Sequence, residues 1–307
     1  MQNESREPGK KRVKPAAFSY HAPKSVEEIL SLLSEHGDEA KILGGGQSLI
    51  PLMALRLATP SVVIDINGVD DLDYVRTDDN TLQIGALARH RDIEELKGLA
   101  EWCPMLLEAI QMVGHVAIRN RGTVVGSMAH ADPAAEWPAM ALGLEGVIDV
   151  VGPSGKRTIA ADDFFVSLLT TAIEPGEVAT EVRLHLPKGR VGSCFLELAR
   201  RHGDFAVTGV GTQMSLSSDR ECVEDARVVA IGVGQTAVRI REAEDVLVGE
   251  SPIDELYREA ARVVHDTIAP SDDIHATADY RRSIAEVLTR RSLAIAAERA
   301  RGETANG

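Results

Sequence analysis

The sequence is poor in cysteine and has no long apolar run. Only three of its 307 residues are cysteines, Cys103, Cys194 and Cys222, and no two of them form a Cys-x-x-Cys pair. Scattered free thiols are typical of the reducing cytoplasm, and three thiolates are too few to hold an iron–sulfur cluster. No stretch approaches the ~18 apolar residues of a membrane span. We therefore expect a cytoplasmic protein with no stable membrane insertion and no cluster of its own.

Basic residues are fewer than acidic ones. The 33 lysines and arginines stand against 47 aspartates and glutamates, for a net charge of −14, which disfavours binding to nucleic acid. The nine histidines form neither a His-Glu-x-x-His motif nor a Cys/His zinc pattern, so no metal site is expected. Residues 1–14 are polar and basic and lack the apolar segment of a secretory signal, so we expect a disordered tail there.

The remaining composition, 44% hydrophobic and 26% charged, is typical of a globular protein of two domains. Residues 15–67 combine β-branched runs with a helix that starts at the capping box Ser25 to Glu28, which predicts a small α/β lobe. Residues 68–190 predict a second, α+β lobe with a hairpin around a Gly-Pro-Ser-Gly turn. Residues 191–307 follow a Pro-Lys-Gly break and form a further domain. Three strands and two helices are expected in it: 194–199, 206–216, 226–232, 253–265 and 278–300.

The first segment with chemical potential is a glycine loop after a short apolar run. It comprises Leu43, Gly44, Gly45, Gly46, Gln47, Ser48 and Leu49. Glycines tolerate positive φ and let the backbone approach a ligand, and consecutive N–H groups form a nest for a diphosphate. A Rossmann site is disfavoured because Leu49 stands where the third glycine of Gly-x-Gly-x-x-Gly belongs. A tight turn without a ligand is the alternative for this segment.

The second segment runs from Arg119 to Glu136 and includes Thr123, Val124, Val125, Gly126 and Ser127. The two hydroxyls and the open backbone at the glycine can meet another face of a diphosphate. Asp132 is expected to cap a helix that starts at Ala134. Glu136, one turn into that helix, can accept hydrogen bonds from sugar or ribityl hydroxyls. Alternatively it is a solvated carboxylate that suits the helix dipole. A metal site at His130, Asp132 and Glu136 is not expected, because no fourth ligand is evident.

The third segment places Arg200 and Arg201 before a His-Gly-Asp turn. Positive charge near a flavin stabilises its anionic reduced form and so tunes its potential. The alternative is a charged hairpin loop between two strands.

Together, and in this order, these segments resemble the FAD-binding medium subunit of the molybdenum hydroxylases. That family includes the flavin subunit of bacterial carbon monoxide dehydrogenase and the flavin domain of xanthine dehydrogenase. The resemblance covers nearly the whole chain, and its combination of motifs is specific. The segments that carry it are Lys14–Tyr20, Gly45–Met53, Ile118–Thr123, Ala129–Glu136 and Arg201–Ala206.

The resemblance implies an α+β architecture. A two-lobed FAD-binding fold of the vanillyl-alcohol-oxidase or PCMH type would span residues 15–190. A domain like that of carbon monoxide dehydrogenase flavoproteins would follow over residues 191–307, with a three-stranded antiparallel sheet and helices. FAD would bind non-covalently, with no catalytic residue and no metal ligand on this chain. The implied cofactor-binding residues are Leu43, Gly44, Gly45, Gly46, Gln47, Ser48, Leu49, Thr123, Val124, Val125, Gly126, Ser127, Glu136, Ala179 and Glu197.

The resemblance also implies partners. A large molybdopterin subunit would hydroxylate the substrate, a small subunit with [2Fe-2S] clusters would carry the electrons, and FAD in this chain would pass them to an external acceptor. The assembly would be a dimer of heterotrimers. Two alternatives are a free-standing flavin oxidoreductase of the same fold and a binding module that has lost its flavin.

Two departures from the family pattern stand out. Val125 replaces a glycine, and because valine tolerates positive φ poorly, we expect it in a β conformation with its side chain packed against the flavin ring or ribityl chain. Some members carry a lysine near the flavin where this chain has Leu196 and Glu197, so the role of that lysine does not transfer. One branch of the family has an extra cysteine-bearing loop that holds an additional iron–sulfur cluster, and that loop is absent from this sequence.

Overall fold

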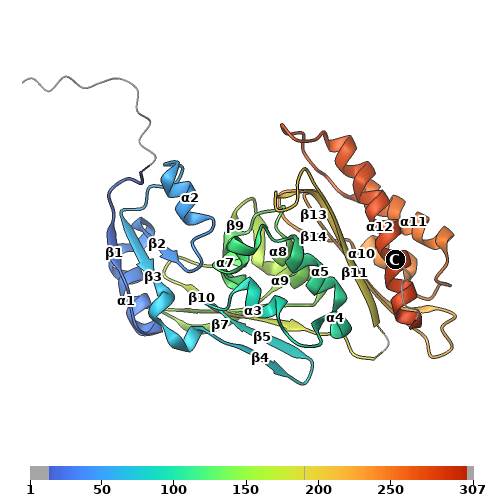
Figure 1. The fold of residues 1–307 in the computed structure, drawn as a ribbon, viewed down its shortest axis with the longest axis horizontal. Helices are drawn as coiled ribbons and strands as arrows, with labels where there is room; N and C mark the ends of the chain where they lie inside the picture. Colours follow the sequence, from blue (N-terminus) through green and yellow to red (C-terminus); the bar gives the residue numbers. More distant parts are fainter. Residues whose placement is uncertain (1–13, 190, 303–307) are drawn as a thin grey trace, which may run out of the picture.

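The computed structural model describes residues 14–189 and 191–302. It arranges them as two lobes followed by a C-terminal domain (Figure 1). The tail predicted for residues 1–14 lies almost wholly outside the described residues. Within the described ranges, no helix is long and apolar enough to cross a membrane.

The first lobe is built on a parallel sheet with the strand order β1-β3-β2. Its elements are β1 (Ser19–His21), α1 (Val26–His36), β2 (Ala40–Leu43), α2 (Leu49–Ala54) and β3 (Val62–Asp65). The predicted capping box is present in a shifted form: the Ser25 hydroxyl accepts from the backbone N–H of Glu28, whose carboxylate accepts from the N–H of Lys24. Because β2 and β3 are parallel and pair Leu43 with Asp65, their carboxyl ends lie at one edge of the sheet.

The second lobe contains an antiparallel sheet with the strand order β4-β5-β10-β6-β7. Its strands are β4 (Val75–Asp78), β5 (Thr81–Gly85), β6 (Val147–Gly152), β7 (Gly155–Ala160) and β10 (Val178–His185), and a short hairpin joins β8 (Phe165–Ser167) to β9 (Thr170–Thr171). The predicted hairpin is confirmed by the pairing of β6 with β7. The helices are α3 (His90–Glu94), α4 (Leu99–Trp102), α5 (Pro104–Met112), α6 (Val116–Arg119), α7 (Val124–His130), α8 (Glu136–Gly143) and α9 (Ala161–Phe164).

The C-terminal domain has a four-stranded antiparallel sheet, so the expectation of three strands was wrong. Its elements are β11 (Val191–Ala199), β12 (Ala206–Leu216), β13 (Val223–Ile231), β14 (Val238–Arg239), α10 (Arg241–Leu247), α11 (Asp254–Thr267) and α12 (Ala278–Arg301). The fourth strand, β14, pairs its two residues with Val229 and Ala230. Two residues are too few to show the alternation by which a strand is recognised in sequence.

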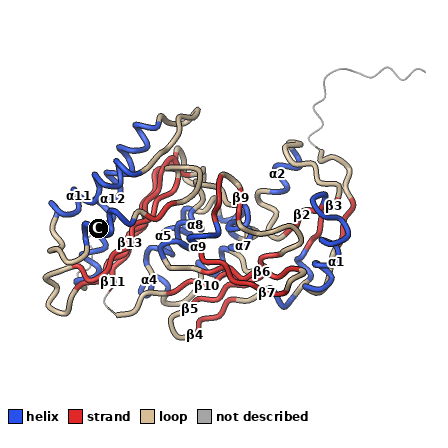
Figure 2. Tube along the Cα trace, turned by 180° about the vertical axis from the view of Figure 1, so that it is seen from behind, coloured by secondary structure: helices blue, strands red, loops and turns tan. Residues whose placement is uncertain are grey.

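Helix α8 lies between the two sheets. Figures 1 and 2 show α5, α7 and α8 between the sheet of the second lobe and the C-terminal sheet. Every residue of α8 is buried. The helix begins at Glu136, not at the expected Ala134, and Asp132 does not cap it. The Asp132 carboxylate accepts from the N–H of Ala134 at 2.9 Å in a local turn. The carbonyl of Pro133 accepts from the N–H of Gly232 at 2.8 Å, which ties this turn to the C-terminal domain.

Candidate functional site

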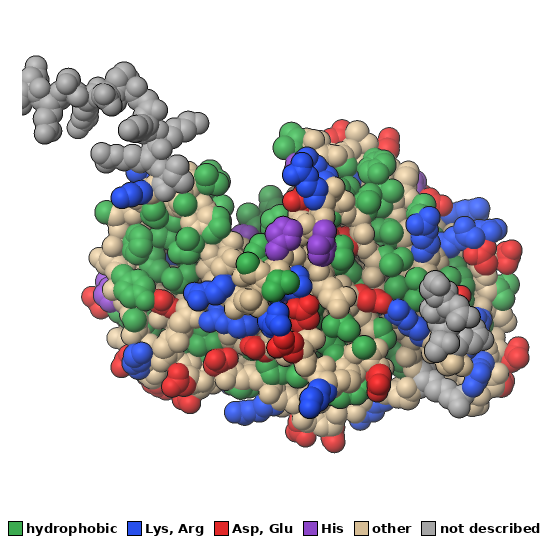
Figure 3. Space-filling model, viewed as in Figure 1, with side chains coloured by type: hydrophobic (Ala, Val, Ile, Leu, Met, Phe, Trp, Pro, Cys, Tyr) green, Lys and Arg blue, Asp and Glu red, His purple; other side chains and the backbone are tan. Residues whose placement is uncertain are grey.

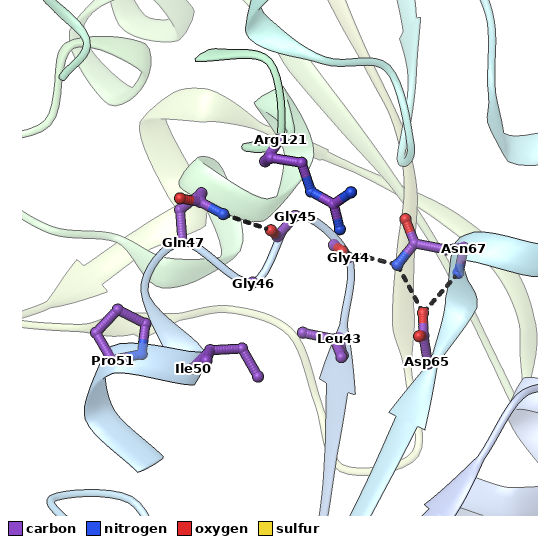
Figure 4. Close-up of a pocket in the computed structure, with 10 residues that line it drawn as sticks. All are labelled: Leu43, Gly44, Gly45, Gly46, Gln47, Ile50, Pro51, Asp65, Asn67 and Arg121. Carbon is purple, nitrogen blue, oxygen red and sulfur yellow. Dashed lines mark hydrogen bonds between the residues drawn. The ribbon is translucent and has the colours of Figure 1, made fainter. Parts of the chain in front are cut away.

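The glycine loop follows β2 and forms one wall of a cavity of about 400 Å³ (Figure 4). The cavity opens at the edge where the carboxyl ends of β2 and β3 meet. The residues that line it are Leu43, Gly44, Gly45, Gly46, Gln47, Ile50, Pro51, Asp65, Asn67 and Arg121. Of the predicted loop residues, Ser48 and Leu49 stand just beyond this lining, where α2 begins.

Backbone donors of the loop are available to a ligand. Within the described residues, the N–H groups of Gly45, Gly46 and Gln47 donate to no protein acceptor. The Gln47 side chain donates to the carbonyl of Gly45 at 3.0 Å and holds the turn. Consecutive free N–H groups in a turn form a nest that suits a phosphate oxygen. The loop therefore fits the diphosphate of a nucleotide cofactor.

The second segment lies directly against the first. A Cβ atom on Gly45 would lie 2.5 Å from the carbonyl oxygen of Arg121 and 2.6 Å from the Cα of Gly122. Positive φ was expected to explain the glycines, but only Gly46 has it, at +72°. Gly45 is required because two backbones approach closely. This contact brings the two predicted segments together at one cavity.

A polar network that sequence reasoning missed fixes the loop from the side of β3. The Asn67 amide donates to the carbonyl of Gly44 at 2.9 Å and to Asp65 at 2.6 Å, and the Tyr20 hydroxyl donates to Asp65 at 2.6 Å. Burial opposes ionisation of Asp65, but the hydrogen bonds from Tyr20 and Asn67 outweigh it and hold its pKa below the ordinary value. Asp65 is the last residue of a strand parallel to β2, and this position is the signal that would have identified it.

Arginine side chains complete this network. Arg89 donates to the Asn67 side chain at 2.6 Å and to the carbonyl of Arg121 at 2.5 Å. Figure 4 shows the Arg121 side chain reaching over Gly44 towards Asn67. A guanidinium group beside a nest of N–H groups adds the positive charge that an anionic ligand needs.

The second segment forms the start of helix α7. Thr123 occupies the N-cap position, and its hydroxyl oxygen accepts from the N–H of Gly126 at 3.1 Å. Thr123 and Val124 are buried, whereas Gly126 is exposed and Ser127 is half-buried. The capping role of Thr123 explains the helix start, and of the residues from Thr123 to Ser127 it is Gly126 and Ser127 that solvent reaches.

Val125 lies inside α7 and not in the expected β conformation. Its side chain is 3% exposed and belongs to the hydrophobic core, and the expected packing against the flavin stays a prediction. Its φ is not positive, and a helical φ is open to valine. The conformation at this position therefore does not require the family's glycine.

Glu136 is the first residue of α8 and is only 7% exposed, so the alternative of a solvated carboxylate was wrong. Burial, with a smaller contribution from the charge of Asp132, raises the pKa of Glu136 to about 7. Ala179 is buried on β10 opposite Val150 and contributes to the hydrophobic core.

Glu197 lies on β11. Both of its carboxylate oxygens are buried and have no hydrogen-bond partner among the described residues. Burial, and then the charge of Glu136, raises the pKa of Glu197 to about 9. A buried polar group without a partner in the chain is a site for a ligand to satisfy.

The third segment belongs to the C-terminal domain and contacts the second lobe. A Cβ atom on Gly203, whose φ is +87°, would lie 2.4 Å from the ring of His115, and the rings of His115 and His202 are 6.1 Å apart. Arg200 and Arg201 are exposed, and the guanidinium of Arg200 lies 3.0 Å from Nδ1 of His275. Figure 3 shows histidine side chains gathered beside the hollow between the first lobe and the C-terminal domain.

Metal-ligating side chains do not cluster in the described part of the chain. No group of three or more His, Cys, Asp or Glu side chains there could hold a metal ion. The three cysteines are free, and burial raises the pKa of Cys103 and of Cys194 to about 12, which keeps both thiols protonated. The N–H groups of the glycine loop and the guanidinium of Arg121 suit the binding of an anionic, polar cofactor.

Comparisons with known proteins give a consistent result. Residues 16–188 match the family model described as the FAD binding domain in molybdopterin dehydrogenase, and residues 193–296 match the CO dehydrogenase flavoprotein C-terminal domain. The chain is 39% identical to the 6-hydroxypseudooxynicotine dehydrogenase complex subunit alpha of Paenarthrobacter nicotinovorans, over 94% of this chain and 97% of the relative. It is 34% identical to the carbon monoxide dehydrogenase medium chain of Hydrogenophaga pseudoflava, over 91% and 96%.

Solved structures agree. A carbon monoxide dehydrogenase structure from Hydrogenophaga pseudoflava superposes with a TM-score of 0.89 at 35% identity, covering 93% of this chain and 99% of that one. Quinoline 2-oxidoreductase from Pseudomonas putida 86 superposes with a TM-score of 0.87 at 34% identity, covering 94% and 99%.

Proposed function

Because this chain belongs to the family of FAD-binding medium subunits of the molybdenum hydroxylases, the carbon monoxide dehydrogenase and xanthine dehydrogenase family, we propose that it binds one FAD non-covalently and passes electrons through it. The chain is the flavoprotein subunit of a molybdenum-containing hydroxylase of the carbon monoxide dehydrogenase type. It is thus an oxidoreductase subunit, the medium chain of a multisubunit complex.

The glycine loop is the proposed diphosphate site. The observation that carries this proposal is the run of free N–H groups at Gly45, Gly46 and Gln47, within the part of the chain that matches the FAD-binding family model. The exposed backbone of Gly126 and the hydroxyl of Ser127 would meet the cofactor from the second segment. The remaining proposed contacts are Leu43, Gly44, Ser48, Leu49, Thr123, Val124, Val125, Glu136, Ala179 and Glu197.

The bound flavin supplies the redox chemistry, and the side chains of this chain hold and tune it. Arg121 and the loop donors would neutralise the diphosphate. Glu136 and Glu197 would meet polar atoms of the cofactor, because both are buried and Glu197 has no partner within the described chain. Arg200 and Arg201 remain candidates for tuning the potential, as exposed cations of the third segment.

The proposed domains are the FAD-binding fold of the vanillyl-alcohol-oxidase or PCMH type over residues 15–190 and the C-terminal domain over 191–307. The two family matches support a boundary near residue 190. The proposed partners are a large molybdopterin subunit and a small [2Fe-2S] subunit in a dimer of heterotrimers. The free cysteines support a cytoplasmic location.

A test with the purified chain separates electron transfer from hydroxylation. The isolated chain, loaded with FAD, should accept electrons from dithionite and pass them to a dye. It should not hydroxylate an aromatic heterocycle or an aldehyde, because that reaction needs a metal centre, which we assign to the large subunit. A chain that binds no FAD under any loading condition would refute the proposal.

A further inference from the structure

A carboxylate lines the cavity at the glycine loop. Asp65 is the last residue of β3 and pairs in register with Leu43, the last residue of β2, after which the loop begins. Asp65 is one of the residues that line the cavity. Figure 4 shows Asp65 and Asn67 on one side of the cavity and Gln47 and Pro51 on the other, with the glycines between them.

A negative charge at this place needs an explanation, because it repels a diphosphate. Burial opposes ionisation of Asp65, but the hydrogen bonds from Tyr20 and Asn67 and the charge of Arg121 hold its pKa below the ordinary value. The carboxyl is therefore ionised at neutral pH. Its contacts within the chain do not require the charge, since an amide could also bind Tyr20 and Asn67. A neutral part of the ligand that donates hydrogen bonds is the partner that suits it.

One acceptor position of Asp65 is open. Oδ1 accepts from the backbone N–H of Asn67 at 3.0 Å and from its side-chain amide at 2.6 Å, and Oδ2 accepts from the Tyr20 hydroxyl at 2.6 Å. Each carboxylate oxygen has two lone pairs, so among the contacts of the described residues Oδ2 keeps one lone pair for a ligand. The side chain is half-buried, so it is held in place by the chain and still reached from the cavity.

The order of the strands indicates which end of FAD meets Asp65. In the first lobe β2 is an edge strand and β3 is the central one. The glycine loop after β2 lies against Arg121 and Gly122 of the second lobe, so Asp65 lies on the first-lobe side of the loop. A diphosphate in the loop separates the adenosine from the ribityl chain and flavin ring. The other proposed contacts belong to the second lobe and the C-terminal domain, which leaves the adenosine on the side of Asp65.

We propose that Asp65 accepts a hydrogen bond from a ribose hydroxyl of the adenosine half of FAD. The inference rests on the proposed function for its ligand. In Rossmann folds an acidic residue about 20 positions after the glycine loop makes this kind of contact. The Gly-x-Gly-x-x-Gly pattern is absent here, yet the spatial relation is similar: β2 and β3 are parallel neighbours, the loop follows β2, and Asp65 ends β3.

The first measurement is the discrimination between ligands by the parent chain. FAD is compared with two analogues that lack the 2′-hydroxyl or the 3′-hydroxyl of the adenosine ribose, and binding is followed by quenching of flavin fluorescence. A hydrogen bond to a charged acceptor contributes about tenfold to binding, so at least one analogue should bind about tenfold more weakly than FAD. Equal binding of all three ligands would overturn the assignment without any variant.

The variant Asp65→Asn separates recognition from support of the loop. Its amide oxygen can still accept from Asn67 and its NH₂ group can donate to the Tyr20 oxygen, but a donor now stands where the open acceptor was. The difference between FAD and the discriminated analogue should therefore disappear. If Asp65 only supports the loop, the variant should weaken FAD and both analogues alike and keep their ratio.

Two further variants should keep the parent's ratio. Asp38→Asn removes an exposed acid of the same lobe, and Tyr20→Phe removes a neighbour of Asp65 but leaves its carboxylate. Thermal unfolding identifies the folded chains, and Asp65→Ser replaces Asp65→Asn if the latter does not fold. If the folded Asp65 variant keeps the ratio of the parent, the assignment of Asp65 is wrong while the flavin assignment stands. If the folded parent binds no FAD, the proposed function fails and the assignment of Asp65 fails with it.

Discussion

Nε1 of Trp137 donates a hydrogen bond of 2.9 Å to Nδ1 of His90, and the two rings stack with their centroids 5.8 Å apart. Both side chains are buried. The N–H of His90 donates to the carbonyl of Gly122 at 3.1 Å. The pair therefore connects α8, one residue after Glu136, to the segment that lies against Gly45. The Trp137–His90 pair therefore supports two parts of the site that are distant in sequence, the start of α8 and the segment at Gly122.

Trp137→Phe should destabilise the fold by about 1–3 kcal/mol, because it leaves the buried acceptor on His90 without a donor, and the smaller ring adds to that loss. Denaturant unfolding measures the change. Trp102→Phe is the control, since Trp102 is 42% exposed, and it should change the free energy of unfolding by no more than about 0.5 kcal/mol. Equal losses of unfolding free energy in Trp137→Phe and Trp102→Phe would contradict a stabilising role of the Trp137–His90 hydrogen bond.

Acid should weaken the fold through His90. Burial, with smaller contributions from Arg119 and Arg89, lowers its pKa from 6.5 to about 3. The unfolded chain therefore binds a proton that the folded chain refuses. This part of the stability is present above the unfolded pKa and is lost as pH falls from 6.5 towards 3. His90→Gln removes the titration and should flatten that part of the profile. An unchanged slope in this variant would show that His90 is not the group concerned.

Gly45→Ala should weaken FAD binding by about 1–3 kcal/mol, because its Cβ would meet the Arg121 carbonyl and push the two segments apart. A flavin titration measures the loss. Gly46→Val should also lose flavin, because valine resists a φ of +72°. Gly234→Ala is the control: its Cβ would meet only the Thr236 carbonyl at an ordinary 3.7 Å. Full flavin content in both loop variants would remove the loop from the site.

Val125→Gly should lower the free energy of unfolding by about 1.5–3 kcal/mol for the lost side chain and by about 1 kcal/mol for glycine in a helix. Val287→Gly in α12 is the control, because Val287 is 43% exposed and should show mainly the helix term. If Val125→Gly were more stable than the parent, the core packing of Val125 would be the wrong account of this departure from the family.

FAD should leave the protein intact on acid precipitation. Cys103 and Cys194 are buried with their thiols held protonated, and Cys222 lies in the turn between β12 and β13. Absorbance of the supernatant near the maximum of oxidised flavin measures the release. Flavin that stays with the precipitated polypeptide would contradict non-covalent binding.

Sequence reasoning succeeded where local signals decide the structure. The glycine loop, the capping residue Ser25 and the long strand β12 each carry their own signal, and all are present. The start of α8 was misplaced because an Asp-Pro pair suits a local turn as well as a cap. The contacts of Asn67 and Arg89 with residues more than twenty positions away have no local signal, since they arise only when the lobes fold.

The burial of Glu136 has the same origin. Its place in the first turn of a helix left a solvated carboxylate open as an alternative, and the C-terminal sheet that covers α8 comes from a segment much later in the chain. The helical conformation of Val125 was not predicted, because Thr123 was interpreted only as a contact for a diphosphate. It is in fact the N-cap residue of α7.

The most direct test of the central claim is the cofactor content of the tagged chain purified from its native host. The account predicts FAD together with molybdenum and iron, brought by a large and a small subunit that co-purify. Dissociation of those subunits should remove both metals and the hydroxylase activity and leave FAD with this chain. If the chain emerges alone and oxidises a small organic substrate without molybdenum, it is a free-standing flavoenzyme and the account is wrong.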